Sequence, residues 1–409
     1  MKPLFNSLGS HYSLATAISA LSQLISANSS APDTLITKLV AEFGGDAYLF
    51  FKGRDAIEFA LRSLKLKPDD LLMTQAFACQ AIEDGVMRAG AQPLYVDLAP
   101  DSTNLSPETL QAAYDAVPHP ELIKAVLIQH SLGMPADTVA IRAWCNQKKL
   151  TLIEDLAQAF GGTDSAGQKL GSSADIVICS FGRDKIIDAL SGGACVIRVA
   201  NVRKAAAELY ANVATTTPPK QIVIRDLVYP IWTWMIRRTL RWGLGSVLFY
   251  FGKALGILKS PTQSPTQQMT GLPAAYAQLA LESWAKLDAQ LYHRRQLAQL
   301  YEEGLTSRQE LKKLLAQDKI GQSTVLRYPI AIAKPDELGL ALAAEGIHLT
   351  DRWYRSAVDS GRLALQSVYA AGSCPNAESL SLRIFNLPTH LEITKPDAQR
   401  IVAAIERHS

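Results

Sequence analysis

Short apolar runs alternate with amphipathic stretches between about residues 46 and 200. The runs are rich in β-branched and aromatic residues, which is typical of buried strands, and the stretches between them have helical spacing. This alternation predicts a mostly parallel sheet with helices on both faces. The expected strands are 47–51, 71–74, 93–97, 125–130, 150–154, 175–180 and 193–198, and the expected helices are 55–64, 78–89, 107–116 and 137–148.

The chain on either side of this region has other patterns. Residues 12–27 are apolar with interspersed Ser, Thr and Gln, which favours an amphipathic helix over a cleaved leader. At 409 residues the chain is too long for one small core, so we expect a second domain. The expected parts are 1–45, an N-terminal helical arm; 46–221, a large domain; 222–260, an apolar and basic helical insertion; and 261–409, a connecting helix and a small C-terminal domain.

The last part begins with a helical pattern that runs from about residue 270 to 304. It continues with expected strands at 327–333 and 382–387 and expected helices at 337–345 and 397–407. The predicted fold class is therefore α/β, with a mostly parallel central sheet and a smaller C-terminal α+β domain.

Composition narrows the class of protein. The net charge of +3 is too small to indicate a nucleic-acid partner. The five cysteines have no CxxC pair or metal-ligand spacing, so we expect free thiols in a reducing cytoplasm and no metal site. No apolar window of 18 residues lacks charges, which argues against a membrane-spanning helix.

Polar residues stand where the expected strands end. Ligands of open α/β sheets bind beyond the carboxyl ends of the strands, and Gly53, His130 and Asp155 follow such ends. Ser180 and Lys185 lie five residues apart around a strand-end turn, so they can reach opposite ends of one small ligand. By themselves these signals are weak, because a loop lysine is usually solvated and a strand-end aspartate often caps a turn.

Several short blocks follow one another in a specific order. They are AGAQPLYVD at 89–97, HSLGMPA at 130–136, IEDLAQA at 153–159, AD at 174–175, SF at 180–181 with Lys185, GG at 192–193, CPNAE at 374–378 and NLPTH at 386–390. Together they resemble the DegT/DnrJ/StrS family of sugar aminotransferases, which depend on pyridoxal 5'-phosphate (PLP) and have the aspartate aminotransferase fold, fold type I. The resemblance covers about two thirds of the chain and makes 46–221 the expected PLP-binding domain.

The resemblance assigns roles to four residues. Lys185 would hold the cofactor aldehyde as a Schiff base and later act as the base that moves a proton. Asp155 would pair with the protonated ring nitrogen and so make the ring an electron sink. Gln158 would contact the ring or its 3-hydroxyl, and Ser180 would bind the phosphate.

The chain departs from the family pattern at two places. The usual Gly-Thr or Gly-Ser of the phosphate loop is Gly53-Arg54 here, at the start of an expected helix. A helix amino terminus and a guanidinium both suit phosphate, although a solvated arginine is the other interpretation. The best register puts Cys79 where an aromatic residue commonly stacks on PLP. Two alternatives remain: Phe77 covers the ring in place of Cys79, or Phe77 and Cys79 are both core residues.

Three further candidates are open to a structural interpretation. His130 is more often structural in this family than in contact with ligand. His390 is expected to pack between domains rather than to catalyse. The cluster Asp351–Arg355 either faces a substrate carboxylate or forms an exposed charged turn.

The resemblance implies an aminotransferase of nucleotide-sugar metabolism and polysaccharide biosynthesis. It would move an amino group from an amino acid, glutamate being the first choice, to a keto group of a nucleotide-linked sugar. The active form would be a cytoplasmic homodimer, because a neighbouring subunit completes the sites of this family.

One alternative to this function keeps PLP and the fold but changes the substrate or reaction. The dehydratase branch of the family is disfavoured, because it has histidine in place of Lys185. Another alternative is a catalytically silent, membrane-associated homologue.

The segment 222–258 motivates that last alternative. Its apolar runs, 227–236 and 242–252, are each about half the ~20 residues needed to span a bilayer. Pro230 is expected to open a helix. Tryptophans and arginines beside short apolar runs suit a helix pair lying in the membrane interface, at the inner face of the membrane. The other interpretation is that these helices pack on the dimer partner or cover the active site.

Overall fold

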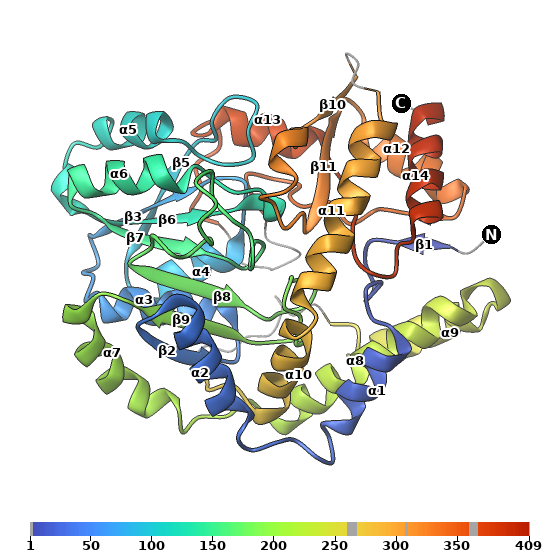
Figure 1. The fold of residues 1–409 in the computed structure, drawn as a ribbon, viewed down its shortest axis with the longest axis horizontal. Helices are drawn as coiled ribbons and strands as arrows, with labels where there is room; N and C mark the ends of the chain where they lie inside the picture. Colours follow the sequence, from blue (N-terminus) through green and yellow to red (C-terminus); the bar gives the residue numbers. More distant parts are fainter. Residues whose placement is uncertain (1–2, 260–267, 307–309, 360–366, 409) are drawn as a thin grey trace.

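The computed structural model describes residues 3–259, 268–306, 310–359 and 367–408. A seven-stranded sheet lies at its centre (Figure 1). All seven strands predicted between residues 46 and 200 belong to it, so the predicted α/β class is confirmed. In spatial order they are β2 (Asp46–Phe50), β9 (Gly193–Ile197), β8 (Ile176–Ser180), β7 (Thr151–Asp155), β6 (Ile123–Gln129), β3 (Leu71–Gln75) and β5 (Gln92–Val96).

The sheet is mixed because β9 runs antiparallel to both of its neighbours, whereas the other adjacent pairs are parallel. Side chains alternate between two cores, as the period of two in a strand requires. Tyr48 and Phe50 face the core under α3 and α7, and Leu49 faces the core under α2 and α10. The helices on the two faces are α3 (Gly53–Ser63), α4 (Gln80–Arg88) and α7 (Ala200–Val213) on one side, and α2 (Ala31–Phe43), α5 (Pro107–Asp115), α6 (Thr138–Lys148) and α10 (Ala274–Trp284) on the other.

The C-terminal part has its own core around Tyr301, Tyr328 and Phe385. Helix α11 (Leu287–Gly304) leads into an antiparallel sheet of β10 (Leu311–Lys313), β11 (Arg327–Ile332) and β14 (Ile384–Pro388). The helices beside it are α12 (Pro335–Ala344), α13 (Pro375–Arg383) and α14 (Lys395–His408). The predicted smaller α+β part is therefore confirmed, while the domain boundaries stay a prediction.

Two-residue strand pairs tie distant parts of the chain together. In the arm, β1 (Leu4–Phe5) pairs with β12 (Ile347–His348) and is followed by α1 (Leu14–Ser22). Beside the central sheet, β4 (Ala78–Cys79) pairs with β13 (Val358–Asp359). The N-terminal arm is thus joined to the C-terminal part, and the C-terminal part is joined to the segment that follows β3 of the central sheet.

Residues 220–254 form a helical hairpin of α8 (Lys220–Thr239), the short η3 (Leu240–Trp242) and α9 (Leu244–Ala254). The prediction that Pro230 opens a helix is wrong, because Pro230 lies in the middle of α8. The buried side chains of Leu227, Tyr229 and Ile236 hold the helix against the body on both sides of the proline, and a proline removes only one helical N–H. Within the described residues, no helix is long and apolar enough to cross a membrane.

Candidate active site

The predicted strand-end residues converge at the carboxyl edge of the sheet. Asp155 ends β7, Ser180 ends the neighbouring β8, and Gly53 begins α3 directly after β2. These three strands run in the same direction, so their carboxyl ends meet at one edge of the sheet. A ligand that touches all three residues would lie where open α/β sheets bind theirs.

Backbone segments approach closely around Gly53. A Cβ atom added to Gly193 would lie 2.6 Å from the Cα atom of Gly53, so only glycine fits there. A Cβ on Gly53 would lie 3.1 Å from the Ser180 hydroxyl oxygen, in the space beside that hydroxyl. The Ser180 Oγ accepts only a long hydrogen bond, 3.4 Å from the backbone nitrogen of Gly182. These residues form a small cradle that fits a phosphate group.

Lys52 directly precedes Gly53 and is a cation that the sequence pattern did not single out. The side chain is buried at the start of α3, and its Nζ makes no hydrogen bond or ion pair among the described residues. Nζ lies 4.4 Å from the centre of the Phe51 ring. Burial lowers the pKa of Lys52 to about 8, although the Asp226 carboxylate opposes the shift. A buried ammonium without a bonded partner beside a helix amino terminus fits an anionic ligand.

Arg54 is engaged elsewhere. Its guanidinium lies 2.6 Å from the carboxylate of Asp84 on α4, and Arg88 lies 3.9 Å from the same carboxylate oxygen. That Arg54 binds phosphate stays a prediction, and Lys52, which has no bonded partner among the described residues, is an alternative at the same strand end. A lysine that directly precedes Gly53 at a strand end was the available signal.

Lys185 and Asp155 are electrostatic neighbours. Burial lowers the pKa of Lys185, against the charges of Cys79, Asp155 and Asp184, which favour its protonated form. Burial raises the pKa of Asp155, against the Ala157 N–H that donates to its Oδ1 at 2.9 Å and the charge of Lys185. Among the described residues, Lys185 Nζ makes no hydrogen bond or ion pair. An amine with a lowered pKa is suited to act as nucleophile and base.

The loop that carries Lys185 is held from two sides. On one side, the Arg183 guanidinium lies 2.7 Å from Asp226 of α8 and 3.7 Å from the centre of the Tyr229 ring. On the other side, the His11 ring of the N-terminal arm lies 3.0 Å from Asp184 and 2.8 Å from Asp188. The arm and the hairpin therefore both position the loop.

Cys79 and Phe77 have different surroundings. Phe77 is fully buried and packs edge-on against Tyr354, with ring centres 5.4 Å apart, so it belongs to a core cluster. Cys79 is half-buried, and its charge acts on both Lys185 and Tyr354. Of the two candidates for covering the ring, Cys79 lies in the electrostatic neighbourhood of the lysine; the assignment itself stays a prediction.

Gln158 lies beside this group with its side chain bonded within the protein. Its Oε1 accepts a hydrogen bond from the backbone of Leu132 at 2.7 Å, and its Nε2 donates to the hydroxyl of Tyr354. Its predicted contact with the ring or 3-hydroxyl is not tested.

The cluster Asp351–Arg355 places an aromatic residue in the site. Trp353 lies between two cations: its ring centre is 4.9 Å from Lys185 Nζ and 4.0 Å from the Arg327 guanidinium. Arg327 also pairs with Asp351 at 2.7 Å. The sequence predicted either a substrate-carboxylate site or an exposed turn for this cluster, and nothing in the local pattern indicated that Trp353 lies beside Lys185. The cluster is therefore more than an exposed turn.

The two other histidine candidates have structural contacts. The Nδ1 of the fully buried His130 accepts from the backbone of Ala136 at 3.1 Å, and its Nε2 lies 3.4 Å from Glu154. His390 contacts the backbone oxygen of Phe5 at 3.3 Å, which joins the arm to the C-terminal part.

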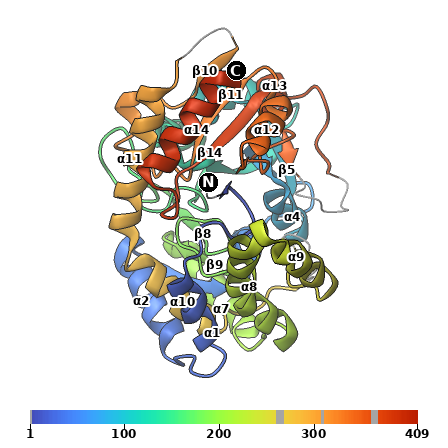
Figure 2. The same ribbon diagram turned by 90° about the vertical axis from the view of Figure 1, so that its right-hand side faces the viewer.

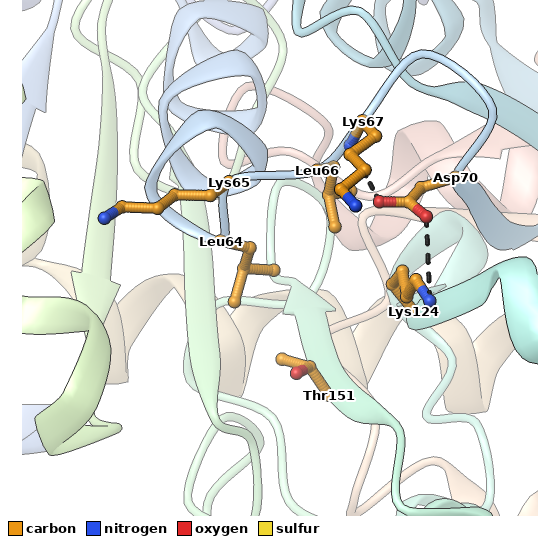
Figure 3. A pocket seen from close by; sticks show the side chains of 7 residues that line it. All are labelled: Leu64, Lys65, Leu66, Lys67, Asp70, Lys124 and Thr151. Atoms are coloured by element: carbon orange, nitrogen blue, oxygen red, sulfur yellow. Dashed lines mark hydrogen bonds and ion pairs between the residues drawn. The ribbon is translucent and has the colours of Figure 1, made fainter.

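A pocket of about 320 Å³ lies at the opposite, amino edge of the sheet (Figure 3). Asp70 there already pairs with Lys124 at 3.7 Å and accepts from the backbone of Lys67 at 2.7 Å. Lys124 and Thr151 begin β6 and β7, far from the ends that carry Asp155 and Ser180. This pocket contains none of the predicted site residues. Its lining residues are Leu64, Lys65, Leu66, Lys67, Asp70, Lys124 and Thr151.

The fold and the site together define a class. A partly buried lysine of lowered pKa, a buried carboxylate at a strand end and a serine-glycine cradle at the neighbouring strand ends suit a PLP enzyme, which uses a lysine for the aldehyde and an acid for the ring nitrogen. Among the described residues, no cluster of ligands could hold a metal ion.

The chain belongs to the DegT/DnrJ/EryC1/StrS aminotransferase family, whose model matches residues 41–221 and 263–406. The predicted family, and PLP as its cofactor, are confirmed. The matched parts leave out 222–262, which contain most of the α8–α9 hairpin.

Individual relatives are similar over part of the chain. A UDP-N-acetyl-3-dehydro-alpha-D-glucosamine 3-aminotransferase of Acidithiobacillus ferrooxidans is 33% identical over 36% of this chain. A 3-oxo-glucose-6-phosphate:glutamate aminotransferase of Bacillus subtilis is 36% identical over 32% of it. The chain spans only 38% and 27% of the lengths of these two relatives. Among solved structures, the PLP form of the putative sugar aminotransferase Spr1654 from Streptococcus pneumoniae is similar, with a TM-score of 0.72, 16% identity and 97% of each chain covered.

Proposed function

We propose that this protein is a PLP-dependent sugar aminotransferase that moves an amino group from glutamate to a keto group of a nucleotide-linked sugar. The observation that carries the proposal is that Asp155 and Ser180 end neighbouring parallel strands at the carboxyl edge of the sheet, with Lys185 in the loop that follows Ser180 and close enough for its charge to act on Asp155. The relative that acts on a UDP-linked 3-dehydro sugar supports the acceptor class, and the relative that uses glutamate supports the donor.

The residues divide the work between binding and proton transfer. When bound, PLP supplies an electron sink for the carbon that gains or loses the amino group. Asp155 would hold the proton on the ring nitrogen through its carboxylate. Lys185 Nζ would take the proton from the substrate carbon and deliver it to the carbon on the cofactor side. Lys52 and Ser180 would hold the phosphate at the far end of the ligand.

The assembly and compartment remain part of the proposal. The apolar composition, 48% of residues, suits a large subunit interface, so we expect a homodimer in the cytoplasm. Light scattering at micromolar concentration should give twice the mass of the 44.4 kDa chain. A fully active monomer would contradict this part of the proposal alone.

Mass spectrometry tests the activity. The enzyme is first converted to its amino form with glutamate and then challenged with a panel of nucleotide keto-sugars, with Lys185→Ala as the control. Wild type should return an amino-sugar and the variant should not. A chain that purifies colourless and stays colourless with added PLP would be the silent homologue. A coloured enzyme that alters a sugar without transferring the amino group would carry out another reaction of the same fold.

A further inference from the structure

The outer side of α9 carries large apolar side chains that nothing in the described chain covers. Leu244, Val247, Phe251 and Leu255 recur at helical spacing, which places them on one face. Exposed apolar residues are normal when scattered, but a contiguous group marks an interaction surface. The group, named here the α9 face, consists of Trp242 (66% exposed), Leu244 (52%), Val247 (49%), Tyr250 (71%), Phe251 (61%) and Leu255 (63%).

The inner side of α9 has the opposite character. A Cβ on Gly252 would lie 2.4 Å from Trp232 of α8, and a Cβ on Gly245 would lie 2.5 Å from the backbone oxygen of Ile236. Small residues thus let α9 pack tightly on α8, where the Trp232 indole also donates to the backbone of Leu248 at 3.1 Å. An ordinary surface helix buries its large apolar residues, whereas α9 buries two glycines and leaves several large apolar residues exposed.

The charged residues in the chain segment that carries this face have one sign. The chain has no aspartate or glutamate between residues 227 and 281, but it has five cations there. Arg241 lies 4.4 Å from the centre of the Trp242 ring, and Lys253 lies 4.6 Å from the centre of the Phe249 ring, so cations and aromatic rings adjoin. Helix α8 lies between α1 and α9 (Figure 2), and α9 projects at the side of the molecule (Figure 1).

We propose that the α9 face docks this protein on an anionic lipid surface. The exposed apolar and aromatic side chains would enter the acyl boundary, and Arg238, Arg241 and Lys253 would contact the headgroups. An α9 of 11 residues is about 16 Å long, roughly half the thickness of a bilayer core, so it lies along the surface. This docking does not depend on the proposed activity.

Charge favours lipid over a second copy of the chain. A two-fold dimer centred on this face would bring each patch against its own copy. Arg241 and Lys253 would then face cations of the partner, with no acid in the segment to offset them. An anionic surface supplies the missing charge and also accepts the apolar side chains.

Co-sedimentation of the full-length, PLP-loaded protein with vesicles tests the proposal. The vesicles consist of phosphatidylcholine alone or of phosphatidylcholine mixed with phosphatidylglycerol, at low and high salt. Wild type should bind the anionic vesicles, bind less at high salt and ignore the neutral ones. The triple variant Arg238→Gln/Arg241→Gln/Lys253→Gln should bind roughly 100-fold more weakly, since each basic residue contributes about 5-fold. Arg237 is left intact, because it binds the backbone oxygens of Leu8 and Tyr12 and holds the arm.

A second set of variants separates the contribution of the apolar side chains from that of the charges. Phe251→Glu and Leu255→Glu should abolish binding to anionic vesicles, while Leu340→Glu and Leu382→Glu, which are even more exposed and lie on α12 and α13, should leave it unchanged. Equal and negligible sedimentation of wild type and all variants would overturn the proposal. A second result would also overturn it: wild type does not bind vesicles, and Phe251→Glu is a monomer in light scattering where wild type is a dimer. The α9 face would then be a protein interface.

Discussion

Replacing Asp226 with asparagine tests whether α8 holds the loop that carries Lys185. The carboxylate is buried, and its Oδ1 lies 2.7 Å from the guanidinium of Arg183, two residues before Lys185. Its Oδ2 accepts from the Tyr276 hydroxyl at 3.4 Å, and the same carboxylate opposes the lowering of the Lys52 pKa. Asparagine keeps the shape and removes the charge.

The expected loss follows from the burial of the pair. Removing one partner of a buried ion pair costs about 3–5 kcal/mol of folding free energy. We expect the lower value here, because the amide oxygen of asparagine can still accept a hydrogen bond from Arg183. An unfolding entropy of about 2.1 cal/mol/K per residue amounts to about 0.9 kcal/mol/K for 409 residues, so the melting temperature should fall by about 3–4 °C. A shift of the loop by about 1 Å should also lower kcat by about 100-fold.

Thermal unfolding followed by circular dichroism measures the first effect, and steady-state amino transfer measures the second. Glu337→Gln is the control, because its pair with Lys334 at 3.0 Å is fully on the surface and should give no measurable change. Arg183→Met combined with Asp226→Leu should recover the melting temperature, since an apolar pair replaces a buried ionic one. If Asp226→Asn melts within a degree of wild type and keeps its kcat, α8 does not position the loop.

The remaining predictions concern the site and the arm. Borohydride reduction and peptide mapping should put the pyridoxyl mass on Lys185, and label on another lysine would refute that assignment. Asp155→Ala should fold normally but lose at least ~100-fold in kcat, and near-wild-type turnover would leave Asp155 as a strand cap. Lys52→Met should weaken PLP binding about 10- to 100-fold in an absorbance titration, and wild-type affinity should fall as the pH rises above about 8, where Lys52 loses its proton; an unchanged titration would exclude Lys52 from the cradle. Wild type should lose stability between about pH 6.5 and 9 as His11 loses its proton, and the His11→Phe variant should not show this loss.

Periodicity predicted the sheet well because most of its strands are buried on both faces, the edge strand β5 being the exception. The runs at 125–130 and 175–180 each contain four consecutive apolar residues, which is typical of a buried strand. The same reasoning located Asp155 and Ser180 at strand ends, since a polar residue after an apolar run marks where the chain leaves the core. Family-specific spacing then selected Lys185 among many loop lysines.

Contacts between distant segments could not be read from local pattern. Trp353 reaches Lys185 only because the C-terminal part folds back, 168 residues along the chain. The two-residue strands β1, β4, β12 and β13 are too short to show any periodicity. Lys52 looked like an ordinary charged residue, because its charged neighbours Asp226 and Arg183 come from distant parts of the chain.

The N-terminal arm should stabilise the Lys185 loop in a pH-dependent way. The protonation of His11 decides whether this stabilisation grows or shrinks as the pH rises. Burial lowers the pKa of His11, but the carboxylates of Asp184 and Asp188 outweigh it and raise the pKa to about 9. Because this exceeds the unfolded value of about 6.5, the stabilisation is complete below about pH 6.5 and is lost as the pH rises through 9. The melting temperature of wild type minus that of His11→Phe should therefore shrink across this interval, whereas the exposed His119→Phe should parallel wild type throughout. Parallel profiles for His11→Phe and wild type would show that the imidazolium does not hold the arm on the loop.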